Sequence, residues 1–214
     1  MKYSKDGKVK FNEDNHTYWL GEKRLQSVTS YISQFKQPFD KKKISFYYAK
    51  KHGLDQFEVL EEWERKGRES CEMGTAVHLV FEKYILGEGI VKTGSYEKEE
   101  MAEFVINDLF ESKRLTPVET EYIVYNNKLA GQVDCIAKNA KGEYFILDWK
   151  TNDEIKKESF KNKKMLGEYS HYPDCSFYHY SIQLNTYKKM CTEYDIKDCF
   201  IVHLDIDNYK LLKV

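Results

Sequence analysis

Acidic and basic residues with the spacing of a reactive centre lie in the segment GQVDCIAKNAKGEYFILDWK, residues 131–150. The run YFILDWK alternates with period two, so Asp148 and Lys150 share one face of a strand, about 6 to 7 Å apart. The preceding strand carries Asp134, and the turn chemistry of residues 139–142 predicts an antiparallel hairpin. We therefore expect two carboxylates and one ammonium group to meet beside this hairpin.

Two carboxylates at one point predict a site for a hard divalent cation. Asp134 and Asp148 would supply oxygen ligands, which favour Mg²⁺ or Mn²⁺ over softer metals, and the backbone carbonyl of Trp149 can supply a third oxygen. A lone D-x-K pattern is more often an ordinary surface ion pair. The interpretation therefore needs further motifs.

Two predicted helices supply such motifs. In GTAVHLVFEKYILG, residues 74–87, His78 and Glu82 stand at i and i+4 on one stripe of an amphipathic helix. In YHYSIQLNTYKKM, Gln183 and Tyr187 have the same spacing, and Tyr180 lies one turn earlier. A single helical histidine is more often a satisfied or surface residue than a ligand, so each motif is weak alone.

The motifs follow one another as G-x-x-x-H, G-x-x-D, an apolar run ending in D-W-K-T, and Y-x-x-Q-L-x-x-Y. This order resembles the RecB-like branch of the PD-(D/E)xK nuclease superfamily. It is especially similar to mitochondrial genome maintenance exonucleases and to their phage and large-DNA-virus relatives. The middle acid is Asp148 rather than the more widespread glutamate, and extra residues separate the D-x-K strand from the glutamine helix.

The resemblance implies a role for each matched residue. His78, Asp134 and Asp148 correspond to metal ligands, and Lys150 to the catalytic lysine. The residues expected to support the active site and the nucleic acid strand are Thr151, Tyr180, Gln183 and Tyr187.

The implied reaction is hydrolysis of a phosphodiester bond by in-line attack of metal-activated water. Lys150 can orient the water, stabilise developing negative charge or, with a pKa lowered by burial, exchange a proton; the sequence leaves these roles open. Glu119 and Glu121 share one side of the strand PVETEYIVY, and either can add a carboxylate or lie on a solvated edge. Glu82 is a third possible acid.

Charge is distributed unevenly along a chain whose formal net charge is −1. A lysine-rich segment follows the D-W-K strand directly and predicts either phosphate contacts or a plain solvated face. Its lysines are Lys156, Lys157, Lys161, Lys163 and Lys164. A second basic patch, at residues 41–43 and 50–51, lies on another predicted helix.

Composition favours one globular α/β (α+β) domain. With 214 residues, 41% hydrophobic and 15% aromatic, the chain can bury a core. No apolar stretch approaches the ~18 residues that span a bilayer, and the start MKYSKDGKVK lacks a signal peptide's apolar region, so we expect no membrane association and a cytoplasmic, intracellular protein. The resemblance is compatible with a phage- or virus-encoded protein. Five cysteines without a C-x-x-C pair indicate neither a disulfide framework nor an iron-sulfur cluster.

The expected architecture is a restriction-endonuclease-like core, a mixed central sheet flanked by helices, with a helical N-terminal part. Residues 1–73 would form an N-terminal hairpin and helices, and residues 74–214 the catalytic core. The remaining expectations concern single elements. We expect strands at 117–125, 128–138 and 143–151, helices at 55–73, 75–86, 96–113 and 177–193, and a C-terminal hairpin turned near Asp207–Asn208 or a last strand with an extension.

The expected function is a metal-dependent deoxyribonuclease, more specifically an exonuclease on DNA ends or single strands in replication, recombination or repair. Its partners would be DNA and, possibly, replication or recombination proteins. One alternative is an RNA or DNA endonuclease that combines a helical histidine, two acids and a lysine. The other is a catalytically silent nucleic-acid-binding scaffold.

Overall fold

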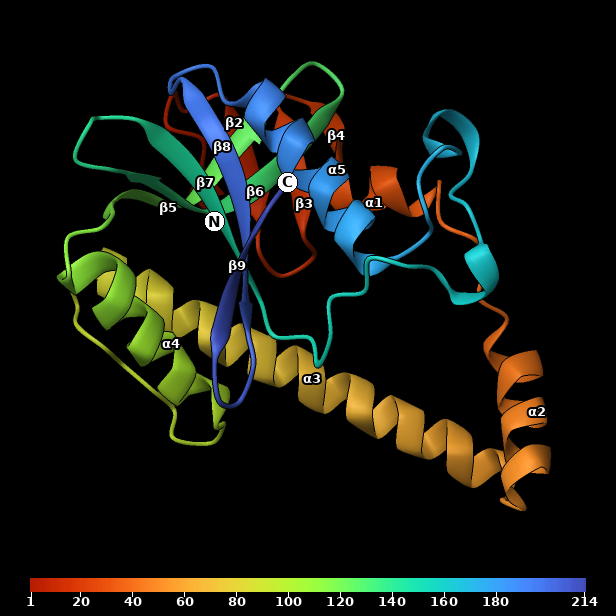
Figure 1. The fold of residues 1–214 in the computed structure, drawn as a ribbon. Coiled ribbons are helices and arrows are strands. Elements are labelled where there is room, and N and C mark those ends of the chain that lie inside the picture. Colours follow the sequence, from red (N-terminus) through yellow and green to blue (C-terminus); the bar gives the residue numbers. More distant parts are fainter.

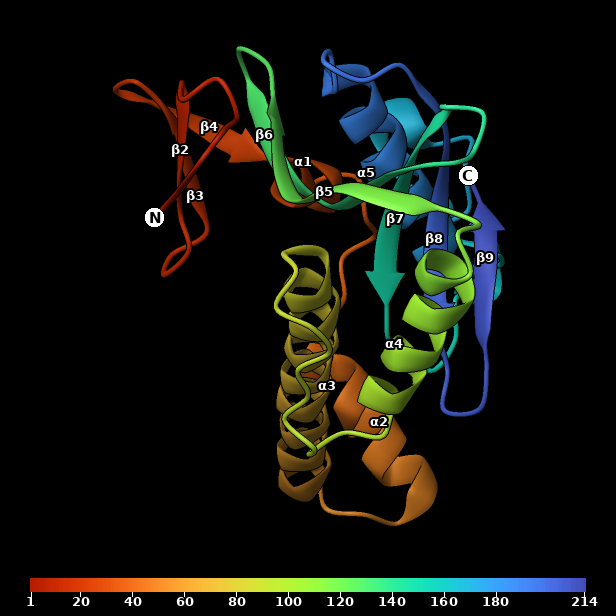
Figure 2. The same ribbon diagram turned by 90° about the vertical axis from the view of Figure 1, so that its left-hand side faces the viewer.

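A large mixed sheet forms the centre of the molecule, with helices on both of its faces (Figures 1 and 2). The computed structural model describes all residues 1–214. The strands run in the order β1-β2-β3-β4-β6-β7-β8-β9, and β5 pairs with β6. The pairs β4–β6 and β7–β8 are parallel, whereas the other pairs are antiparallel. The strands are β1 (Lys2–Tyr3), β2 (Val9–Asn12), β3 (Thr17–Leu20), β4 (Lys23–Ser27), β5 (Thr116–Tyr125), β6 (Leu129–Lys138), β7 (Tyr144–Lys150), β8 (Ile196–Leu204) and β9 (Tyr209–Lys213).

Five α-helices accompany the sheet. They are α1 (Val28–Ser33), α2 (Lys41–His52), α3 (Gln56–Ile85), α4 (Lys98–Ile106) and α5 (Ser176–Met190). A π-helical turn, Asn107–Glu111, continues α4. None of the helices is both long enough and apolar enough to cross a membrane.

Each face of the sheet has its own apolar core. On one face, α1 and α5 pack against side chains that include Val133, Ile146 and Ile201. On the other, α3 and α4 cover a cluster that includes Leu147 and Trp149. Neighbouring β7 residues therefore point to opposite faces, which confirms the predicted period of two.

Most predicted strands are confirmed within one or two residues, and so are the turns. β5, β6 and β7 match the expected segments, and residues 139–142 connect β6 to β7, where Asn139 Oδ1 accepts from the backbone N–H groups of Lys141 and Glu143. The chain after β8 turns at Asp205–Asn208 and returns as β9, so the hairpin alternative is correct.

The predicted break between helices 55–73 and 75–86 is wrong. α3 is continuous over 30 residues, begins at the N-cap Asp55 and passes through Gly74 without interruption. A Cβ atom at Gly74 would lie 3.4 Å from Thr151 Oγ1, an ordinary contact distance, so this glycine faces the chain after β7 and does not end the helix. α3 thus crosses the boundary between residues 73 and 74 at which the sequence pattern divides the chain.

Two further helix boundaries differ from expectation. The helix expected at 96–113 is split into α4 and the π-helical turn, and the helix expected at 177–193 ends at Met190. Cys191, which follows α5, has a backbone outside the helical region and packs in the core, so tertiary contacts end the helix earlier than its sequence pattern suggests.

Candidate active site

β6 changes its neighbours along its length, and this change creates the site. Its first residues pair with β4, whereas residues 135–138 pair with β7. Beyond the pair Cys135–Leu147, the strands β6 and β7 separate. There the backbone N–H of Trp149 donates to Asp134 Oδ2 at 2.9 Å, so a side chain replaces the missing backbone acceptor. Asp134 is therefore fixed at the fork between the two strands.

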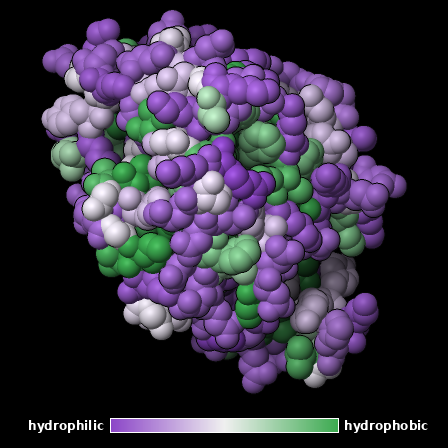
Figure 3. Space-filling view, turned by 60° about the vertical axis from the view of Figure 1, so that its left-hand side comes forward, coloured by the Kyte–Doolittle hydropathy of each residue, from purple (hydrophilic) through white to green (hydrophobic).

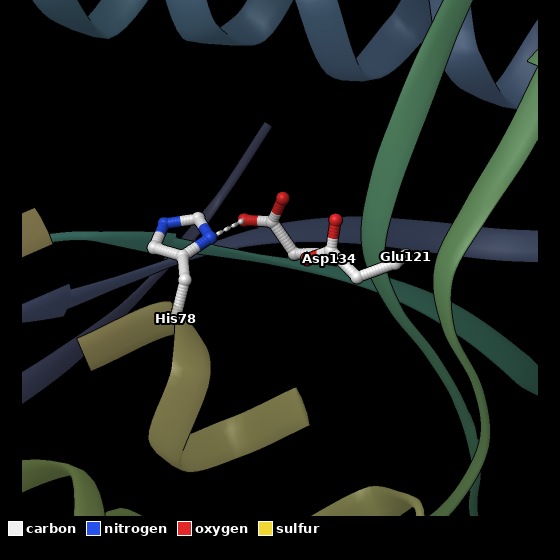
Figure 4. A group of neighbouring side chains, drawn as sticks. All are labelled: His78, Glu121 and Asp134. Atoms are coloured by element: carbon white, nitrogen blue, oxygen red, sulfur yellow. Dashed lines mark ion pairs between the residues drawn. The ribbon is translucent and has the colours of Figure 1, made fainter. Parts of the chain in front are cut away.

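Three potential metal ligands from three elements meet at this fork. His78 of α3, Glu121 of β5 and Asp134 of β6 each offer one ligand atom, and these atoms lie within 4.8 Å of one another (Figure 4). His78 Nδ1 lies 3.7 Å from Asp134 Oδ2. We call these three residues the metal cluster.

The backbone of β7 orients the imidazole of His78. Its Nε2 lies 3.2 Å from the carbonyl oxygen of Trp149, which can only accept a hydrogen bond. With the proton on Nε2, Nδ1 presents its lone pair toward Asp134, as a metal-ligating histidine requires. Lys150 Nζ also donates to this carbonyl, at 3.2 Å. The Trp149 carbonyl, which the sequence predicts as a metal ligand, thus accepts from the side chains of His78 and Lys150 in this structure.

Glu121 reaches the metal cluster because its backbone is unusual. It has φ of +50°, in the left-handed region that non-glycine residues seldom adopt, although it lies within β5. It stands opposite Asp134, between the register pairs Thr120–Cys135 and Tyr122–Val133. This conformation is a candidate for functional strain because it aims a carboxylate at another carboxylate.

Glu119 does not join the cluster, contrary to the expectation that it shares a side with Glu121. Its carboxylate instead contacts Lys5 Nζ at 2.7 Å and accepts from the hydroxyl of Tyr194. A register shift in β5 between Pro117 and Glu119, together with the left-handed backbone at Glu121, breaks the regular alternation of the strand. Glu82, the third predicted acid, forms an ion pair with Lys2 at 3.0 Å.

The metal cluster holds more negative charge than its surroundings favour. Burial raises the pKa of Glu121 to about 8, and the nearby charge of Asp134 adds to the rise. A proton or a cation is needed to hold these two carboxylates together. One imidazole nitrogen and two carboxylate oxygens at this spacing could hold a metal cation.

Asp148 and Lys150 form a second group beside the metal cluster, on the α5 face of β7. Asp148 is 1% exposed, and its Oδ2 lies 2.5 Å from Lys150 Nζ; that oxygen has no partner with hydrogen-bond geometry. Asp148 was predicted as a metal ligand, but the structure pairs it with Lys150 and leaves it outside the three-residue cluster. We call Asp148 and Lys150 the catalytic pair, after the role that the sequence pattern predicts for them.

Opposing effects set the charges of the catalytic pair. Burial lowers the pKa of Lys150, but attraction by Asp148 and Asp134 outweighs burial, so the pKa is raised and the ammonium persists. Burial raises the pKa of Asp148 despite the attraction of Lys150, and repulsion by Asp134 acts in the same direction. Asp134 therefore lies close enough to couple electrostatically with both groups.

The helix α5 closes the site with the predicted supporting residues. Lys150 Nζ lies 5.0 Å from the centre of the Tyr180 ring, and the hydroxyl of Tyr180 donates to Asn152 Oδ1 at 2.8 Å. One turn further, Gln183 Nε2 donates to the hydroxyl of Tyr187 at 3.0 Å. The motif Y-x-x-Q-L-x-x-Y thus lines the side of the site opposite α3.

Thr151, which follows β7, lies at the crossing of this strand with α3. Its carbonyl oxygen accepts from Lys98 Nζ at 2.8 Å, and His203 Nε2 lies 2.6 Å from the carbonyl of Asn152. Lys98 and His203 were not predicted to be near the site. They follow no local motif, because only the packing of α4 and β8 brings them there.

The lysine-rich segment is exposed, as a phosphate-contacting segment requires. Only Lys156 has an acidic partner, Glu154 at 3.9 Å, whereas Lys157 Nζ lies 5.0 Å from the centre of the Phe177 ring. The lysines without an acidic partner within 4.0 Å are Lys157, Lys161, Lys163 and Lys164. Positive charge in the segment that follows β7 in the chain is thus available to an anionic ligand.

Comparison of the chain with models of protein families gives no match, and a search of curated proteins gives none either. What the chain does must therefore be inferred from the residues of the site.

Proposed function

We propose that the chain is a metal-dependent deoxyribonuclease that hydrolyses phosphodiester bonds. The observation that carries this proposal is the meeting of His78, Glu121 and Asp134 within 4.8 Å, next to the buried ion pair of Asp148 and Lys150. A purely structural ion pair does not require two carboxylates, such as those of Glu121 and Asp134, to lie close enough to repel each other. Such a group is expected where a cation binds during function.

The metal cluster would hold Mg²⁺ or Mn²⁺ through His78 Nδ1 and the carboxylates of Glu121 and Asp134. A divalent ion bound there supplies a Lewis acid that lowers the pKa of water and offsets charge on the phosphate. Trp149 orients His78 through its carbonyl and Asp134 through its N–H, and so keeps two ligands in place.

Lys150 supplies a fixed positive charge on the other side of the fork. Its raised pKa keeps the ammonium protonated at neutral pH, which favours stabilisation of the developing charge on the phosphate over proton abstraction. Asp148 holds this ammonium, and Tyr180 covers it.

The order of elements supports a restriction-endonuclease-like core. α3 and α4 precede the antiparallel strands β5, β6 and β7, and α5 leads to β8, which is parallel to β7. The helices α1, α2 and α3 would be the helical N-terminal part of this architecture. With the motif resemblance, this order favours a RecB-like nuclease of DNA replication, recombination or repair.

Action as an exonuclease on DNA ends or single strands rests on the resemblance. The rival is an endonuclease acting on RNA or DNA, which a metal cluster of this kind would serve equally well. A circular single strand separates the two, since it offers no end.

The test is digestion of end-labelled and circular substrates during a titration with Mg²⁺ and with Mn²⁺. Substrates are single- and double-stranded DNA labelled at the 5′ or 3′ end, circular single-stranded DNA, and RNA. We expect metal-dependent release of nucleotides from linear DNA and slow cleavage of the circle. Cleavage of the circle at least as fast as of the linear strand contradicts exonuclease action, and faster cleavage of RNA favours the ribonuclease alternative.

The matched control is Asp134→Asn, which removes the charge but keeps an oxygen to accept from the N–H of Trp149. We expect this variant to be inactive. Hydrolysis by the variant at the parental rate would point to a contaminating nuclease. Metal-independent binding of DNA without hydrolysis by the parent would favour the silent scaffold.

A further inference from the structure

α2 lies at the far end of α3, away from the central sheet (Figure 1). It packs against α3 through Ser45, Ala49 and Tyr48, whose ring centre lies 5.8 Å from that of Trp63. The N-cap Asp40 and the left-handed C-cap Gly53 define its ends. The helix therefore has one face on α3 and one face turned outward.

The outward face has a composition unusual for a solvated helix. Phe46 and Tyr47 are 51% and 61% exposed, and Lys43 and Lys50 lie one turn before and one turn after them. On an amphipathic helix, aromatic side chains normally lie on the buried face. A cluster of exposed aromatic side chains therefore indicates a binding surface. Phe39, just before α2, and Phe57, at the start of α3, are also exposed. Figure 3 shows apolar side chains among polar ones at the lower end of the molecule, where these helices lie.

Positive charge on this helix is not neutralised within the chain. Residues 36–54 contain six lysines against one aspartate, in a chain with a net charge of −1. Lys41 is the exception, because it pairs with Glu64 at 2.8 Å. The lysines of this helix without an acidic partner within 4.0 Å are Lys42, Lys43, Lys50 and Lys51. They remain available to an anionic ligand.

We propose that the outward face of α2, formed by Lys43, Phe46, Tyr47 and Lys50, binds single-stranded nucleic acid. The choice of this ligand rests on the proposed function. The two lysines lie about 10 Å apart along the helix axis, with the rings between them. Phosphates contact the ammonium groups while unpaired bases stack on the rings, a combination typical of surfaces that bind single strands.

Hydrogen bonds connect the chain just before α2 to the lysine-rich segment that follows β7 in the sequence. In the chain before α2, Gln37 Nε2 donates to the carbonyl of Lys164 at 2.6 Å. The N–H of Leu166 donates to the carbonyl of Phe35 at 2.7 Å. The chain segments that carry the two sets of unpaired lysines are thus hydrogen-bonded to each other. α2 lies at the N-terminal end of α3, and His78 lies near its C-terminal end. A strand bound to α2 could therefore also contact the lysine-rich segment.

A paired duplex fits this surface less well, because its bases are not free to stack on Phe46 and Tyr47. Anionic membranes also attract surfaces that combine lysines with aromatic rings. The paired rings of Phe46 and Tyr47, 5.6 Å apart between unpaired lysines, favour the nucleic acid, and a vesicle serves as the competing probe.

The test measures binding of labelled oligothymidylate to the full chain by fluorescence anisotropy in EDTA, where hydrolysis cannot contribute. One variant is Phe46→Ala with Tyr47→Ala, and a second is Lys43→Gln with Lys50→Gln. All four side chains lie on the outward face, so both variants should fold, as circular dichroism would verify. The matched controls are Phe104→Ala, an exposed ring on α4, and Lys138→Gln with Lys141→Gln at the β6–β7 turn.

We expect the aromatic variant to bind oligothymidylate about tenfold more weakly, with little change for a blunt DNA hairpin. The lysine variant should reduce the slope of log affinity against log salt by about 1.4, corresponding to two lost phosphate contacts. Both controls should bind like the parent.

Equal binding by the parent and both variants overturns the proposal, and so does binding of the parent to phosphatidylserine vesicles but not to oligothymidylate. If the parent protein digests DNA and both variants bind oligothymidylate normally, the role of α2 is refuted and the proposed hydrolysis stands. A parent that digests no DNA, with binding that depends on α2, refutes the proposed hydrolysis and leaves this surface standing.

Discussion

Lys150 remains charged inside the protein because two carboxylates face it. Burial alone would lower its pKa, which would make it a candidate proton acceptor, whereas Asp148 and Asp134 raise the pKa above its ordinary value. This balance separates roles that the sequence left open. It favours an ammonium group that stabilises charge on the substrate.

Replacement of Lys150 by alanine should therefore reduce turnover by a factor of about 100 or more while metal affinity is retained. It also leaves Asp148 buried without a counter-charge, so we expect the free energy of unfolding to fall by ~3 kcal/mol at neutral pH. Steady-state hydrolysis, calorimetric titration with Mn²⁺ and urea unfolding measure the three quantities. Lys138→Ala, on the exposed end of β6, is the matched control, and full activity in Lys150→Ala would contradict the assigned role.

Glu121 should make the stability of the metal-free protein depend on pH. Its pKa is about 8 in the folded chain against an ordinary value of 4.5. Between these values the folded chain binds the additional proton, so the free energy of unfolding falls as pH rises through this interval, by up to about 5 kcal/mol. Below pH ~4.5 both states are protonated and this contribution is constant.

The variant Glu121→Gln cannot ionise, so its free energy of unfolding should fall less between pH 5 and pH 8. Urea unfolding in EDTA at several pH values tests this expectation. Asp148 shifts in the same direction, so the slope should decrease without vanishing. An unchanged slope in Glu121→Gln would show that Glu121 is ionised throughout the interval.

Among the elements, β6 and α5 approach each other unusually closely. A Cβ atom at Gly131 would lie 2.3 Å from Cε1 of Tyr187, so only glycine permits this contact. The contact sets the height of α5, and therefore of Tyr180 and Gln183, above the catalytic pair. The glycine of the G-x-x-D motif thus has a packing role three residues before Asp134.

Gly131→Ala should consequently lower the free energy of unfolding by ~2 kcal/mol or more, because neither the strand nor the buried ring can move easily. Gly74→Ala is the control, since its added Cβ would meet Thr151 Oγ1 at an ordinary 3.4 Å and alanine favours the helix. Denaturant unfolding of both variants measures the difference. Equal stabilities would show that α5 shifts freely over β6.

At the scale of the whole molecule, the metal cluster adds to the contacts between α3 and the sheet, which also include the contact of His78 with the Trp149 carbonyl. His78 lies on the long helix α3, whereas Glu121 and Asp134 belong to the β5–β6 hairpin. The same helix carries α2 at its other end (Figure 1). A cation bound between these elements would connect the sheet to the helix that bears the proposed strand-binding surface.

Addition of Mn²⁺ or Mg²⁺ should therefore stabilise the folded protein. At a free metal concentration of about 100 times Kd, the free energy of unfolding should rise by about 2.7 kcal/mol. Thermal and urea unfolding with and without metal measure the change. Asp134→Asn should lose most of this effect, and equal stabilisation of parent and variant would place the binding site elsewhere.

Local patterns in the sequence determined the strand that carries the catalytic pair. Period-two alternation in residues 144–150 placed Asp148 and Lys150 on one face and Trp149 on the other, because both faces of β7 are covered by helices. The turn at residues 139–142 was predictable since Asn139 and Gly142 satisfy it locally. Nearest-neighbour chemistry was sufficient for these features.

Only the tertiary structure decided which acids share the metal cluster. Strand alternation places Glu119 and Glu121 on the same side of β5. In the structure, Lys5 and Tyr194 bind the carboxylate of Glu119 away from the cluster. The left-handed backbone of Glu121 turns its carboxylate toward Asp134. α3 likewise continues through Gly74, where the sequence pattern predicts a break between two helices. These features depend on contacts between residues that are distant in sequence, and local propensities carry no information about such contacts.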